Sequence, residues 1–150
     1  MDEVVAARRS LPADHVEIER LRAAAGIELA ELRGGDVLVA SVETSELAAT
    51  AWGDVATFVG TIADAVVGFA RGSRRGARAD LEELYVERAA RRVGVGEALL
   101  QAVIAWAEAG GCTAIDSRAL PGSRDTKNFF EGHGMVSRLI VVAKELGDDH

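Results

Sequence analysis

Residues 81–100 read LEELYVERAARRVGVGEALL, and this stretch decides the fold. Residues 81–86 are apolar apart from two carboxylates and predict a β-strand, while the apolar spacing from residue 98 onward predicts a helix. Gly94 and Gly96 stand where the intervening charged turn enters that helix. The first turn of a helix carries amide N–H groups without intrahelical partners, and glycines allow a close approach of the backbone to an anion. The stretch therefore predicts a phosphate-binding loop, with added positive charge from Arg91 and Arg92.

The composition indicates one globular domain in the cytoplasm. The chain has 150 residues, 49% of them hydrophobic and 27% charged, which is enough for a core of its own. A net charge of −7 argues against nucleic-acid or membrane partners and favours cationic or amine partners. The single Cys112 excludes an internal disulfide, and no segment has the pattern of a signal peptide or membrane span. The three histidines lack metal-ligand spacing, so no metal is expected.

The hydrophobic pattern predicts a mixed sequence of strands and helices with no linker or repeat. A hairpin is expected about Ala63 and Asp64, and residues 71–78, which carry four arginines, are expected to form a solvated loop. Gly26 leaves open whether the first helix is one element or two, and residues 36–42 are either a strand or irregular. The remaining strands are predicted at 4–7, 55–62, 65–71, 81–86, 113–120 and 136–146, and the helices at 14–32, 45–52, 94–109 and 124–133.

The phosphate-binding loop also carries a family resemblance. It lacks the Gly-Lys-Ser/Thr of nucleoside-triphosphate loops and the G-x-G-x-x-G of dinucleotide folds. Instead, residues 91–96 read R-x-x-G-x-G shortly after a predicted strand that ends in Leu-Tyr-Val, which resembles the acyl-CoA-binding signature of the GNAT superfamily of N-acetyltransferases. Residues 129–135, FFEGHGM, are similar to the family's F-Y-E-x-x-G-F helix end. The resemblance implies one GNAT-like acyltransferase domain over residues 1–150, a mixed α/β (α+β) fold whose mostly antiparallel sheet is flanked by helices on both faces.

The resemblance also implies a binding site for acetyl-CoA as co-substrate. In that family the end of the strand splays from its neighbour, and its free amide and carbonyl groups bind the pantetheine arm, while the turn that follows binds the pyrophosphate. The positions that match those of the family, and are expected to contact acetyl-CoA, are Leu84, Tyr85, Val86, Arg91, Arg92, Val93, Gly94, Val95, Gly96, Glu97, Ser123 and Asn128.

Transfer to an amine requires a deprotonated nucleophile, and Glu82 is the first candidate for the base. Strand alternation predicts that Glu82 shares a face with Leu84 and Val86, with Tyr85 on the other face. Glu83 is the second candidate; alternatively, both carboxylates are solvated charges and ordered water removes the proton.

The family's tyrosine acid corresponds to Phe130, which has no hydroxyl group, so Ser123 is the candidate substitute. Cys112 is not expected to act as a nucleophile, because it lies at a helix–strand junction away from the thioester.

The leading hypothesis is an N-acetyltransferase that acts on a primary amine of a small molecule or peptide. A non-catalytic acyl-CoA-binding module and a purely structural domain are the alternatives. The short segment after Gly134 suggests that the last strand either stays single or is completed by a partner subunit in a homodimer.

Overall fold

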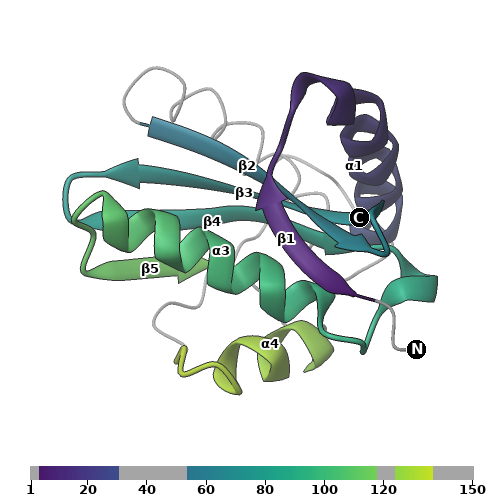
Figure 1. Ribbon diagram of the computed structural model, residues 1–150. Helices are drawn as coiled ribbons and strands as arrows, with labels where there is room; N and C mark the ends of the chain where they lie inside the picture. Colours follow the sequence, from purple (N-terminus) through teal and green to yellow (C-terminus); the bar gives the residue numbers. More distant parts are fainter. Residues whose placement is uncertain (1–3, 31–53, 118–123, 137–150) are drawn as a thin grey trace, which may run out of the picture.

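The structure is a computed structural model that describes residues 4–30, 54–117 and 124–136, in which five strands form one sheet in the order β1-β2-β3-β4-β5 (Figure 1). Neighbouring strands from β1 to β4 are antiparallel, and β5 is parallel to β4 because α3 carries the chain back across the sheet. The predicted mixed fold with a mostly antiparallel sheet is confirmed. The elements in chain order are β1 (Val5–Arg9), a 3-10 helix (Pro12–Asp14), α1 (His15–Ala30), β2 (Asp54–Ile62), β3 (Ala65–Arg75), β4 (Arg78–Val86), a 3-10 helix (Arg88–Ala90), α3 (Val95–Ala109), β5 (Ala114–Ser117) and α4 (Arg124–Glu131).

Helices cover both faces of the sheet, as predicted (Figure 1). On one face α3 buries Leu99, Leu100 and Val103 against strand residues that include Phe58 and Leu81. On the other face α1 buries a smaller cluster formed by Ile18, Leu21, Val59 and Phe69. α3 crosses the strands at positions without side chains, Gly60, Gly68 and Gly72, where an added Cβ would lie within 3.3 Å of helix side chains. The glycines therefore allow α3 to pack directly on the strand backbone.

The prediction of a solvated loop over residues 71–78 is wrong. β3 runs on to Arg75 and β4 begins at Arg78, so only Gly76 and Ala77 form the connection. The arginines and small residues of this stretch belong to two strand ends, and three of the four arginines, Arg71, Arg74 and Arg78, have specific partners. Arg71 is only 6% exposed and lies beside Glu82, while Arg74 stacks on Trp106 at 4.1 Å and reaches Asp54.

A β-bulge overturns the predicted direction of Glu82. Arg71 pairs with Glu83, but the next residue, Gly72, pairs with Leu81, so Glu82 is an extra residue in β4. The side chain of Glu82 contacts Ser73 and Arg71, which lie on the face that α1 covers. Strand alternation was broken by the bulge, and Glu82 shares the face of Glu83 and Tyr85 rather than that of Leu84 and Val86.

The remaining predictions largely match the described residues. The hairpin at Ala63 and Asp64 is confirmed, and α1 is one continuous helix through Gly26. α3 ends at Gly110–Gly111 as predicted, whereas α4 stops at Glu131, two residues early. Predictions for residues 31–53, 118–123 and 137–150 lie outside the described residues. Among the helices that are described, none has the length and apolar character needed to cross a membrane.

Candidate functional site

The loop that enters α3 has the geometry of an anion site. Arg92 and Gly94 have positive φ values of 70° and 98°, and Gly94 is the N-cap of α3. The helix's own hydrogen-bond ladder begins at Ala98, whose N–H donates to the Gly94 carbonyl at 3.0 Å, so the amides of Val95, Gly96 and Glu97 have no intrahelical acceptor. Arg92, Val93 and Gly94 are exposed. An anion at this exposed turn would meet free amides and the positive end of the helix dipole.

The end of β4 lies next to this loop. Within the described residues, β4 pairs with β5 only from Arg78 to Leu81, whereas residues 83–86 pair with β3 alone. β5 is described only as far as Ser117, the partner of Leu81, so the predicted divergence of the strand end stays a prediction. The carbonyl of Val86, expected to contact pantetheine, accepts a hydrogen bond from Arg91 Nε at 2.7 Å. Arg91 thus fastens the loop to the strand end.

A charged cluster that the sequence analysis missed links this loop to α1. Glu28 of α1 accepts hydrogen bonds from Arg91 Nη2 at 3.0 and 3.2 Å, from Arg88 Nη2 at 3.1 Å and from the Tyr85 hydroxyl. Burial alone would raise the pKa of Glu28, but these hydrogen bonds outweigh it and lower that pKa. Burial and the bond to Glu28 raise the pKa of Tyr85. In the sequence Glu28 is one charge among many on a helix, so no local signal marks it.

The other predicted cofactor residues surround the first turn of α3. Val95 is buried, and Leu84 and Val86 pack against the α3 core. A Cβ at Gly96 would be 3.5 Å from the Phe129 ring, so α4 packs beside this turn. Glu97 is exposed, and its Oε1 lies 3.9 Å from His133 Nε2. Asn128 is also exposed, and Ser123 lies outside the described residues.

Glu82, the predicted base, is deeply buried. Its side chain is 2% exposed, Oε1 accepts a hydrogen bond from Ser73 Oγ at 3.1 Å, and Oε2 lies 3.3 Å from Arg71 Nη1. Burial raises the pKa of the Glu82 carboxyl despite the opposing charge of Arg71 and the Ser73 hydrogen bond. A raised pKa makes this carboxylate a stronger base than an ordinary glutamate.

Glu83 and Phe130 are less suited to proton transfer. The Glu83 carboxylate is held by Arg22, whose Nε and Nη2 donate at 3.2 and 2.8 Å. Phe130 is 8% exposed and packs edge-on against Phe129, so its ring belongs to the core. Among the described residues near the end of β4, Tyr85 is the one that carries a phenolic hydroxyl.

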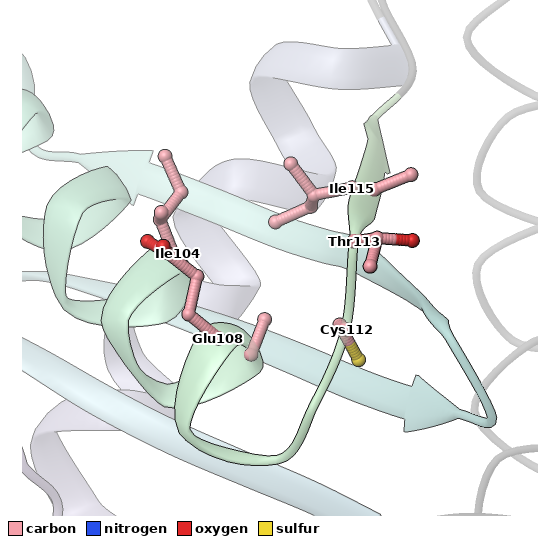
Figure 2. Close-up of a pocket in the computed structure, with 7 residues that line it drawn as sticks. Ile104, Glu108, Cys112, Thr113 and Ile115 are labelled. Atoms are coloured by element: carbon pink, nitrogen blue, oxygen red, sulfur yellow. The ribbon is translucent and has the colours of Figure 1, made fainter.

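A separate pocket of about 250 Å³ lies between the C-terminal half of α3 and β5 (Figure 2). Ile104, Glu108, Cys112, Thr113 and Ile115 line it. Glu108 lies about 20 Å along the helix from Val95, and the lining contains no arginine to hold a phosphate. The pocket is therefore distinct from the anion site. Cys112, one of its lining residues, lies between α3 and β5, at the predicted helix–strand junction. No group of three or more metal-ligating side chains occurs in the described segments.

Comparisons with known proteins agree with this arrangement. Residues 25–135 match the sequence model of the acetyltransferase (GNAT) family. The aminoglycoside N-acetyltransferase AAC(6')-Iy, solved with a CoA-linked bisubstrate analogue, has a TM-score of 0.67 and 20% identity, covering 95% of this chain and 99% of that one. An aminoglycoside 6'-N-acetyltransferase from Acinetobacter haemolyticus has a TM-score of 0.66 and 18% identity, with coverage of 95% and 99%.

A transcriptional regulator from Bacillus halodurans is similarly close, with a TM-score of 0.67, 18% identity and coverage of 95% and 100%. No curated protein sequence matches significantly. At these identities the solved structures establish the fold alone. The family match spans most of the chain, including β4, the anion loop and α4, and the protein therefore belongs to the GNAT acetyltransferase family.

Proposed function

We propose that the protein transfers the acetyl group of acetyl-CoA directly to a primary amine of a small cationic acceptor. One observation carries this proposal: the exposed turn at Gly94 presents the free amides of α3 beside the end of β4. These amides suit the diphosphate, and the strand end suits the amide groups of the pantetheine arm. Similar structures that hold CoA or a CoA-linked analogue support this assignment.

The acceptor class rests on charge and on the similar enzymes. The net charge of −7 favours a cationic partner, and two of the similar structures are aminoglycoside acetyltransferases. We propose a small-molecule amine on this basis. A peptide amine is the other acceptor to include in a screen.

In the proposed reaction the amine nitrogen attacks the thioester carbonyl, an N–C bond forms, and the C–S bond breaks with the sulfur leaving as thiolate. Glu82 is the proposed base that takes the proton from the amine, because burial raises the pKa of its carboxyl. Glu83 is the weaker candidate because Arg22 holds its carboxylate. No acid is essential, since a thiol of ordinary pKa leaves adequately as thiolate, and Ser123 stays a prediction for that role.

The second candidate function is a non-catalytic acyl-CoA-binding module. It is favoured by Phe130, which occupies the position of the family's tyrosine and is buried in the core. Release of free thiol from acetyl-CoA in the presence of a panel of amines separates the two functions. A binding module holds the ligand and releases no thiol above the background rate.

The first test is thermal denaturation with and without acetyl-CoA. Ligand at about one hundred times its dissociation constant stabilises a fold by about 2.7 kcal/mol, which for a chain of this size is a rise in Tm of about 5–10 °C. Arg92→Glu, which reverses a charge on the exposed loop, should reduce the rise. Arg75→Glu makes the same change at the exposed end of β3 and should leave the rise intact. No rise in the wild type would refute acyl-CoA binding.

A further inference from the structure

Glu28 contacts three residues that belong to the proposed cofactor site or border it. Its carboxylate, 26% exposed, receives Arg91, Arg88 and the Tyr85 hydroxyl, and Arg91 also lies over the Tyr85 ring at 5.4 Å from its centre. α1, which carries Glu28, is separated from β4 in sequence by two strands. The cluster therefore joins the α1 face of the sheet to the loop that enters α3.

The Glu28 carboxylate is already bound to the guanidinium group that a cofactor phosphate would need. Arg91 directs Nε to the Val86 carbonyl and Nη2 to both oxygens of Glu28. A guanidinium binds carboxylates and phosphates with the same planar arrangement of donors, so these two anions are alternative partners. Arg88, 77% exposed, makes a single contact to Glu28 and is easily redirected.

The Tyr85 hydroxyl makes an exchange of partners feasible. If the arginines turned to a phosphate, Glu28 would still accept a hydrogen bond from a neutral, half-buried donor. A carboxylate that keeps one hydrogen-bond donor and is partly exposed to water loses less stabilising free energy than a carboxylate left without partners in the interior.

We propose that Glu28 is a positioning residue of the cofactor site, which competes with the diphosphate of acyl-CoA for Arg91 and Arg88 and thereby sets the affinity for the cofactor. This inference rests on the proposed function. Glu28 offsets part of the charge of the two guanidinium groups and holds them close to the strand end in the free protein. Binding of the dianionic diphosphate displaces it.

The test is calorimetric titration of CoA into the wild type, Glu28→Gln and Glu19→Gln. Glu28→Gln keeps an acceptor for Tyr85 but removes the competing charge, so CoA should bind about threefold to tenfold more tightly. Glu19 is a half-exposed carboxylate on the same helix that contacts Arg22. Substitution of Glu19 changes the net charge by the same amount at a position away from the loop, so the affinity for CoA should change less than twofold.

A double-variant cycle shows whether Glu28 acts through the arginines. In a background of Arg88→Gln and Arg91→Gln, the substitution of Glu28 should alter the CoA dissociation constant by less than about twofold. A thermal melt of each variant without ligand confirms that it is folded. Unchanged or weaker binding by folded Glu28→Gln, or the same gain in the background without the arginines, would overturn the inference while leaving the proposed function intact. No CoA binding by the wild type would overturn both.

Discussion

The close contact between Gly60 of β2 and the first turn of α3 links the core to the anion site. A Cβ at Gly60 would lie 2.5 Å from Val95 Cγ1 and 3.1 Å from Leu99 Cδ1. Val95 is the first residue of α3, is 1% exposed and follows the N-cap Gly94. We therefore expect Gly60→Ala to displace the helix end that the proposed diphosphate site uses.

The size of the effect follows from the geometry. An ordinary carbon contact begins near 3.4 Å, so Val95 must move by about 0.9 Å. A buried valine in a helix has one preferred rotamer, and the backbone of the first turn must take up much of this movement. Overpacking of this kind costs about 1–3 kcal/mol, or a fall in Tm of about 3–10 °C. Displaced amides should weaken CoA binding about tenfold, the equivalent of about 1.4 kcal/mol.

Gly72→Ala is the matched control. Its Cβ would lie 2.9 Å from Val103 Cγ1 and 3.3 Å from Trp106, at the same helix–sheet interface but about 12 Å further along α3. It should destabilise the fold to a similar extent and leave CoA affinity within about twofold. Thermal melts and calorimetric titration with CoA measure the two effects separately. Equal weakening of CoA binding by both variants, or unchanged stability and affinity in Gly60→Ala, would refute this link between Gly60 and the anion site.

Three further predictions concern the hairpin turn, Glu82 and Tyr85. Ala63 and Asp64 have φ values of 49° and 70°, so the pair Ala63→Asn with Asp64→Gly should stabilise the fold by about 1 kcal/mol in chemical denaturation, and a loss of stability would contradict the turn assignment. Folding raises the pKa of Glu82 above its ordinary 4.5, so its protonated form stabilises the fold at low pH and this contribution is lost as pH rises through the folded pKa. The unfolding free energy of Glu82→Gln should therefore fall less than that of the wild type as the pH rises above 4.5. Parallel curves of unfolding free energy against pH for the two proteins would contradict a raised pKa for Glu82. Tyr85 is the only tyrosine, so tyrosinate absorbance reports it alone; Glu28→Gln should lower its pKa toward the ordinary 10.0, and an unchanged titration would show that burial alone raises it.

Local patterns were sufficient wherever the physical cause is local. The strand, glycine turn and helix of residues 81–100 follow from apolar spacing and from the conformational freedom of Gly94, and the structure places them as predicted. The hairpin at Ala63 and Asp64 is also confirmed. Each depends on residues that lie close together in the chain.

Other features depend on how two segments far apart in the chain pair with each other, and the sequence could not determine these features. The direction of Glu82 was predicted wrongly because a bulge arises from the register between β3 and β4, which neither strand specifies alone. Arg71 was placed in a loop because its buried partner Glu82 lies on the next strand.

The cluster around Glu28 has the same origin. Its donors come from β4 and the loop after it, and they meet the carboxylate only because α1 packs on that face of the sheet. The sequence by itself determined the family, the order of the described elements and the glycine turn before α3, since propensity, periodicity and glycine geometry act over a few residues. The tertiary structure alone decided which charges meet and which face each carboxylate takes, since the partner of a charged side chain is set by packing between segments far apart in the chain.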